Sequence, residues 1–211
     1  MRNALIVLLL GSLLVACKRN EAKGQTGSGT GTTVRTEDTE REQARFDAER
    51  KPEKVVEALG LKPGSKVADI GAGSGLLTVH LARAVKPNGK VVATDIDEGV
   101  LELMQTRLQN AGLADYVERK VVAADTPGLE KNEYDAILLA EVDHYFSDPV
   151  TWLKTAAQSL KPGGRLVISN RIHHQAKSVA AATKAGLKVV SQTTPVPTHF
   201  IAVFTVPEAR K

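Results

Sequence analysis

The chain has 211 residues, of which 42% are hydrophobic, 25% charged and 4% aromatic, and its formal net charge at pH 7 is +4. The small basic excess is spread along the sequence with few aromatic residues to stack on bases, which argues against a nucleic-acid partner. A single cysteine excludes an intrachain disulfide.

The first 17 residues predict an export signal. Arg2 supplies a positive start, and residues 4–10 and 13–15 form an apolar core too short to span a membrane comfortably. Leu14-Val15-Ala16-Cys17 resembles the lipobox of bacterial lipoproteins, in which the cysteine is lipidated and becomes the new N-terminus. We therefore expect a signal peptide over residues 1–16 and lipidation of Cys17. This places a lipid-anchored protein on the periplasmic or extracytoplasmic face of the cell envelope; the alternative is a cytosolic chain with an apolar start.

Residues 17–43 are rich in Gly, Thr, Ser and charge and have almost no large apolar side chain, so we expect a flexible tether. Residues 36–51 alternate acids and bases, which is typical of a solvated and helical lead-in. Residues 44–211 are enough for one domain of ordinary size.

Residues 67–75, with the sequence VADIGAGSG, predict a buried β-strand that runs into a glycine turn. Glycines let the backbone turn tightly and approach a ligand without a Cβ in the way. A dinucleotide site requires a glycine at the sixth position after the turn begins, where this chain has Leu76. A nicotinamide-dependent oxidoreductase is therefore disfavoured.

The carboxylate of Asp69 stands two residues before Gly71, and with it the segment resembles the first motif of class I S-adenosylmethionine (AdoMet)-dependent methyltransferases. The resemblance implies AdoMet as the cofactor. The alternative is a glycine-rich strand-to-helix turn that only packs an ordinary α/β sheet.

A second carboxylate follows at the distance that a ribose site requires, about 20 residues on. Asp95 closes a strand predicted over residues 90–95, after a helix predicted over residues 76–85. A carboxylate can accept hydrogen bonds from both ribose hydroxyls, so we assign Asp95 to the ribose. The competitor, Asp97, is better placed to cap the helix that begins at Glu98.

A third strand, predicted over residues 119–124, ends in Ala124-Asp125. Asp125 resembles the family residue that meets the adenine amino group; alternatively, it is a turn residue before Pro127-Gly128.

The remaining elements complete the alternation of strands and helices. Residues 134–140 predict a central parallel strand, and residues 149–160 a helix that Asp148 caps. The run Leu160–Ile168 resembles the turn and fifth strand of the same family. The other expected elements are a helix over residues 174–185 and strands over residues 187–192 and 200–206.

The resemblance spans about residues 52–206 and implies an α/β, Rossmann-like, doubly wound seven-stranded sheet whose last strand is antiparallel. The sequence style is similar to that of ubiquinone and menaquinone C-methylating enzymes. The expected cofactor-binding residues are Asp69, Ile70, Gly71, Ala72, Gly73, Gly75, Asp95, Ile96, Ala124 and Asp125.

Candidate acid–base groups follow the fourth strand, where open α/β sheets place ligands: Glu141, Asp143 and His144. Each has a structural alternative, because Glu141 could line the adenosine pocket, Asp143 could hold the loop and His144 could pack on the next helix. Related small methyltransferases often carry a His pair here, which His144-Tyr145 half matches. No metal-ligand spacing of His, Cys and Asp occurs, so we expect no metal.

These features predict an AdoMet-dependent methyltransferase acting on a small or lipid-like acceptor, with membrane contact through the N-terminal lipid. The alternative is an exported, non-catalytic lipoprotein that binds AdoMet or another adenosine ligand, or serves as a scaffold, because a familiar fold does not establish function. The oligomeric state is left open.

Overall fold

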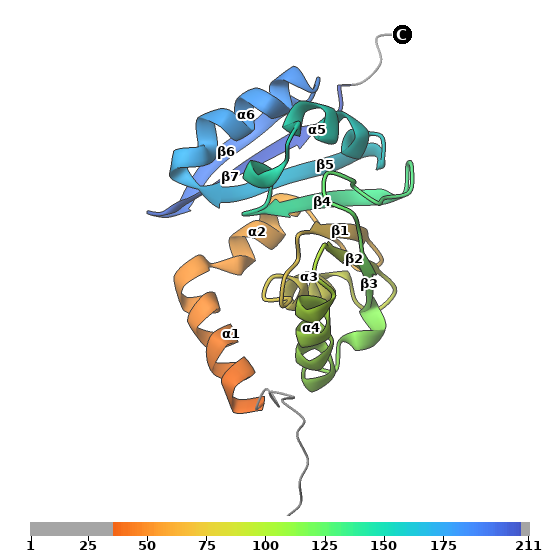
Figure 1. Ribbon diagram of the computed structural model, residues 1–211, viewed down its shortest axis with the longest axis vertical. Coiled ribbons are helices and arrows are strands. Elements are labelled where there is room, and N and C mark those ends of the chain that lie inside the picture. The colour runs from red at the N-terminus through yellow and green to blue at the C-terminus, as the bar shows by residue number, and fades with distance from the viewer. Residues whose placement is uncertain (1–35, 208–211) are drawn as a thin grey trace, which may run out of the picture. The chain divides into compact units, whose positions relative to one another are not determined.

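The computed structural model describes residues 36–207, so the predicted signal peptide, Cys17 and the tether up to residue 35 lie outside the described residues. The described chain forms a seven-stranded sheet in the order β3-β2-β1-β4-β5-β7-β6 (Figure 1). The strands are β1 (Lys66–Ile70), β2 (Lys90–Asp95), β3 (Val117–Val121), β4 (Tyr134–Ala140), β5 (Leu160–Arg171), β6 (Lys188–Val196) and β7 (His199–Thr205). The helices are α1 (Thr36–Arg50), α2 (Pro52–Leu59), α3 (Thr78–Val85), α4 (Glu98–Asn110), α5 (Pro149–Ala157) and α6 (Gln175–Lys184).

The pairing of the strands confirms the expected fold class. β3, β2, β1, β4 and β5 pair in parallel, and β7 enters antiparallel between β5 and β6. Helices α2, α3 and α4 bury their apolar sides in one cluster on one face of the sheet. Helices α5 and α6 do so on the other face. The parallel strands therefore all point their carboxyl ends at one edge, where the glycine turn lies.

The predicted bounds of β2 and β4 agree with the structure, because both strands are apolar and buried along their middle residues. β3 begins and ends earlier than expected. It is an edge strand on which most side chains are exposed, so hydrophobicity does not mark its ends. As a result Ala124 and Asp125 lie in the loop beyond β3, not on the strand.

Residues 36–43 of the expected tether are part of α1, which begins at Thr36. The helix is held by polar contacts centred on Arg107 of α4, whose guanidinium is buried. Arg107 donates to the Thr39 carbonyl at 3.0 Å and pairs with Glu42, while its Nε donates to the Ser74 carbonyl at 2.9 Å. One arginine therefore joins α1 to the glycine turn.

None of the helices in residues 36–207 is long and apolar enough to cross a membrane.

Asp69, at the end of β1, is a buried link between strand and helix. It is 1% exposed, and its Oδ2 accepts a hydrogen bond of 2.7 Å from the Thr78 hydroxyl at the start of α3. Burial raises the pKa of the Asp69 carboxyl to about 7, partly opposed by the Thr78 hydrogen bond and assisted by the charge of Asp95.

Asp69 should make the protein less stable as the pH rises from about 4 to 7. In that window the folded state retains a proton that the unfolded state has lost, so the free energy of unfolding falls by up to about 4 kcal/mol and levels off above pH 7. Asp69→Asn should remove this decline, as measured by urea unfolding at pH 5 and pH 8. The exposed Asp115→Asn is the control and should keep it; a wild-type decline that survives in Asp69→Asn would contradict the assignment.

Candidate functional site

The site lies at the edge of the sheet where four neighbouring parallel strands end. Along the order β3-β2-β1-β4, the residues at or just beyond these ends are Asp125 in the loop after β3, Asp95, the glycine turn and Glu141. The crevice outside the carboxyl ends of such strands is where open α/β sheets bind ligands.

The three glycines of the turn have positive φ angles: 63° for Gly71, 54° for Gly73 and 84° for Gly75. A Cβ on Gly71 would lie 2.6 Å from Val142 Cγ2, and one on Gly75 would lie 2.5 Å from Met104 Cγ. A Cβ on Gly73 would have no protein atom within 4 Å. Gly71 and Gly75 therefore permit close packing, whereas Gly73 presents bare backbone to open space.

The Asp95 carboxylate is fixed by the backbone on both sides. Its Oδ2 accepts a hydrogen bond of 2.9 Å from the Gly73 N–H, and its Oδ1 accepts one of 3.1 Å from the Asp97 N–H. Asp97 has the expected different task of capping α4, accepting from the N–H groups of Gly99 and Val100. Asp95 is thus the carboxylate that faces the crevice.

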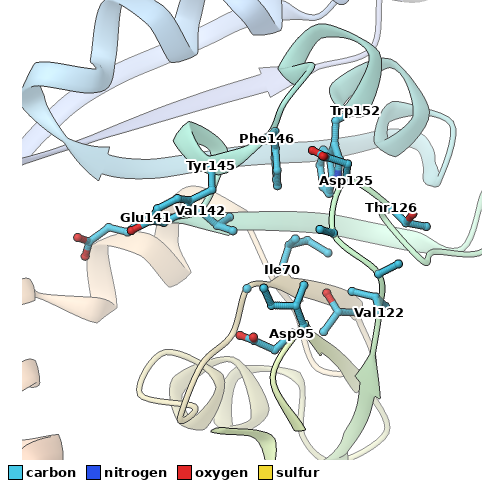
Figure 2. Close-up of a pocket in the computed structure, with 15 residues that line it drawn as sticks. Ile70, Asp95, Val122, Asp125, Thr126, Glu141, Val142, Tyr145, Phe146 and Trp152 are labelled. Carbon is cyan, nitrogen blue, oxygen red and sulfur yellow. The ribbon is translucent and has the colours of Figure 1, made fainter.

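Beside Asp95 lies a pocket of about 290 Å³ (Figure 2), near the lower end of the range of roughly 300–1,000 Å³ common for ligand sites. Six of the predicted cofactor residues line it: Ile70, Gly71, Asp95, Ile96, Ala124 and Asp125. The other four do not: Asp69 is buried behind the turn, and Ala72, Gly73 and Gly75 lie outside the pocket wall.

The sequence did not single out the apolar wall of the pocket. Phe146 and Trp152 stack with their ring centroids 4.2 Å apart and an interplanar angle of 14°. Val122, Val142 and Tyr145 also line the pocket. The hydroxyl of Thr94 is buried at the wall without a hydrogen-bond partner among the described residues. The aromatic residues of 145–152 were the one signal that could have indicated this wall.

Asp125 has a left-handed backbone, with φ of 61°. Its carboxylate accepts hydrogen bonds from the Ser147 N–H at 2.8 Å and the Ser147 hydroxyl at 2.7 Å. These bonds lower the pKa of Asp125. The residue is therefore an ionised acceptor at one end of the pocket, and it also fastens the loop after β4.

Glu141 is the one predicted acid–base residue that lines the pocket. Its Oε1 lies 2.5 Å from Nη1 of Arg50, at the end of α1, and its Oε2 lies 3.4 Å from Nε of Arg171. Burial acts to raise the pKa of this carboxyl, but the bond and charge of Arg50, with His199 and Arg171, bring it below its ordinary value. In Figure 2 the carboxylate extends away from the aromatic wall of Phe146.

Asp143 and His144 lie outside this pocket. Asp143 is buried and accepts hydrogen bonds from Asn170, at 2.7 Å, and from the Ser178 hydroxyl, so it holds the loop to β5 and α6. The His144 ring stacks on His174 with centroids 4.3 Å apart. The contacts of Asp143 correspond to its structural alternative, whereas His144 packs on His174, which precedes α6. Within residues 36–207, no group of three or more His, Cys, Asp or Glu side chains could hold a metal ion.

The pocket fits the adenosine end of AdoMet in its chemistry. It offers a carboxylate beside an open glycine, a second carboxylate acceptor and an apolar wall for a flat ring. Asp95 would hold the ribose, Asp125 the adenine amino group, and Ile96 and Val122 the faces of the base.

Comparison with known proteins agrees with this geometry. Residues 68–166 match a family model described as a methyltransferase domain. The ubiquinone/menaquinone biosynthesis C-methyltransferase UbiE of Cronobacter sakazakii is 32% identical over 114 residues, which are 54% of this chain and 45% of that protein. The chain thus matches less than half the length of this relative.

Among solved structures, a SAM-dependent methyltransferase from Aquifex aeolicus superimposes with a TM-score of 0.70 at 23% identity, covering 81% of this chain and 98% of that one. The geranyl diphosphate C-methyltransferase of Streptomyces coelicolor A3(2) superimposes with a TM-score of 0.64 at 14% identity, covering 80% and 82% of the two chains. These two likenesses support the fold. The family model matches residues 68–166, and over that segment the chain is similar to methyltransferase domains.

Proposed function

We propose that the protein is an active methyltransferase that moves a methyl group from AdoMet to a small or lipid-like acceptor. The observation that carries the proposal is the Asp95 carboxylate, held by the Gly73 N–H at the edge of a ligand-sized pocket. Bound AdoMet supplies an electrophilic methyl group on a sulfonium. The residues of this chain bind and orient the reacting groups, which is the main requirement of an in-line displacement.

The acceptor proposal rests on the surface around the pocket. Ile96 and Tyr145 line the pocket and are 65% and 77% exposed, so the pocket presents apolar surface that suits an acceptor with an apolar part. The relative from Cronobacter sakazakii is named for quinone biosynthesis, which agrees with such an acceptor. Glu141 is the candidate to receive a proton or a hydrogen bond from it, because it alone of the three acid–base candidates lines the pocket.

We further propose that the domain works at the cell envelope. The support is the sequence Leu14-Val15-Ala16-Cys17 after a short apolar segment, which resembles a lipoprotein signal. In that case the acceptor is met at a membrane surface, which agrees with its lipid-like character.

Asp95→Ala should weaken binding of S-adenosylhomocysteine by about 1.5–3 kcal/mol, the usual loss when hydrogen bonds to a charged group are removed. Isothermal titration calorimetry of the full-length protein measures this loss. Asp97→Ala is the control, because it removes a helix cap two residues away and should leave affinity unchanged. Equal affinity of wild type and a folded Asp95→Ala variant would remove Asp95 from the ribose role.

Gly73→Ala should abolish binding of S-adenosylhomocysteine, since the added methyl group enters the space where the ligand approaches the turn. Gly112→Ala is a matched control, with φ of 65° and likewise no atom within 4 Å of the added Cβ. Both variants should lose about 1 kcal/mol of stability through the left-handed backbone, but only Gly73→Ala should lose the ligand. Calorimetry and thermal melting separate the two effects; normal binding by Gly73→Ala would exclude the turn from the site.

Cys17→Ser should move the full-length protein from the membrane fraction to a soluble or signal-retaining form. The acylated N-terminal cysteine would carry several acyl chains, which anchor a protein far more stably than one. Cell fractionation and mass spectrometry of the N-terminus measure this change. Wild-type protein found in the cytosol with Met1 still attached would disprove export without affecting the proposed chemistry.

A further inference from the structure

Four side-chain rings form a continuous strip at the surface beside the pocket. Tyr145 lines the pocket and is 77% exposed. Its ring centroid lies 4.0 Å from that of His144, which stacks on His174 with centroids 4.3 Å apart. The ring of His173 follows, 4.0 Å from that of His174. This ring strip links the loop after β4 to the short 3₁₀ helix after β5.

The chain beside the ring strip adds an apolar and a cationic side chain. Ile172, which precedes His173, is 41% exposed. The side chain of Arg171 lies 3.4 Å from Glu141 and is still 64% exposed. The strip therefore continues from the mouth of the pocket to an exposed isoleucine and an exposed guanidinium.

A second cation stands on the other side of the strip. Lys177, in the first turn of α6, lines a hollow of about 200 Å³ together with His144 and His174. Lys177 is exposed, and its ammonium has no hydrogen-bond or ion-pair partner in the described part of the chain. Asp143, the carboxylate of the hollow, is buried and accepts hydrogen bonds from Asn170 and the Ser178 hydroxyl.

The balance of charge on this surface is positive. Residues 171–177, with the sequence RIHHQAK, include two basic residues and no acidic one. Amphipathic rings such as that of tyrosine concentrate at the headgroup level of membranes, and basic side chains are attracted to anionic lipids. Nucleic acids are bound through larger sets of phosphate contacts. An anionic lipid surface is therefore the partner that rings, an apolar side chain and two cations fit together.

The length of chain before α1 is compatible with such docking. Residues 18–35 reach at most about 60 Å when fully extended. A domain of roughly 170 residues is about 40 Å across. With Cys17 lipidated, as proposed above, the tether is long enough to let any face of the domain meet the bilayer. The chemistry of the surface then decides which face docks.

We propose that the ring strip, with Arg171, Ile172 and Lys177, docks the domain on a bilayer that contains anionic lipid. Because Tyr145 belongs both to the strip and to the pocket wall, docking brings the mouth of the pocket to the lipid surface. A lipid-like acceptor then reaches the pocket without crossing water. The inference rests on the proposed function and names the face by which the domain meets its acceptor.

The test locates the docked face with a fluorophore on a single cysteine. In the full-length Cys17→Ser chain, which has no other cysteine, a solvent-sensitive label is attached at Ala176→Cys, beside the strip, or at Val190→Cys, on the edge strand β6. Both positions are exposed, and both chains share the same N-terminal segment. The vesicles are phosphatidylcholine with roughly one third phosphatidylglycerol and a nitroxide-labelled lipid as quencher. The label at residue 176 should be quenched at least about threefold more than the label at residue 190, and pure phosphatidylcholine should remove the difference.

Lys177→Gln in the chain labelled at residue 176 should lower the docked fraction relative to the undocked one about fivefold, the effect expected for one basic residue at an anionic surface. Lys184→Gln, an exposed lysine at the other end of α6, is the matched control and should change it less than about twofold. Ile172→Ser is the second variant and should also weaken docking. Thermal melting shows that each labelled chain is folded.

Equal quenching at the two positions, or quenching that ignores anionic lipid and Lys177, would overturn the inference. A label at residue 176 that responds to a single-stranded oligonucleotide and not to anionic vesicles would overturn it in favour of a nucleic acid. Calorimetry with S-adenosylhomocysteine on the same chains separates the two proposals. Normal binding without docking contradicts the inference alone, whereas docking without binding contradicts the proposed function.

Discussion

The hydrogen bond from the Gly73 N–H to the Asp95 carboxylate is the contact on which the site depends. It joins the turn after β1 to the end of β2, so the two loops that face the crevice hold one another in place. The bond requires the left-handed backbone of Gly73, which a side chain would make costly. The carbonyl of Ser74 in the same turn accepts a hydrogen bond from Arg107. The turn is thus fixed on its ligand side by a carboxylate and on its protein side by a guanidinium.

Much of the fold could be predicted because its central strands are apolar and covered on both faces. The bounds of β2 and β4 follow from such runs, and Asp95 follows from its place at the end of one. β3 could not be placed to the residue, because an exposed edge strand has no apolar pattern. Helix α1 was assigned in part to the tether because its attachment uses charges contributed by α4 and the loop after β4. Sequence spacing does not report such distant pairings.

The residues of the candidate site likewise fall into those that could be predicted from the sequence and those that could not. Residues that lie in the motif itself, such as Gly71 and Asp95, could be recognised from type and spacing, and they line the pocket. Asp69 belongs to the motif but is buried behind the turn, where its carboxylate accepts a hydrogen bond from the Thr78 hydroxyl. Phe146 and Trp152 were the one signal for the apolar wall, but their types and spacing do not show that a loop residue and a helix residue stack on each other beside the pocket. The sequence could not distinguish among the acid–base candidates, because the hydrogen bonds that Asp143 accepts from Asn170 and Ser178 come from distant parts of the chain.

The polar attachment of α1 has a thermodynamic consequence. Neither apolar cluster of the described chain includes a residue of this helix, whose close contacts are ion pairs and hydrogen bonds. Releasing the helix therefore exposes little hydrocarbon, so the step would add little to the heat capacity of unfolding or to its denaturant dependence. The ion pairs of α1 are partly buried and lie well within the Debye length of about 8 Å at physiological ionic strength, so salt screens them only in part. An unfolding curve that follows the packed sheet would therefore report little of the release of α1.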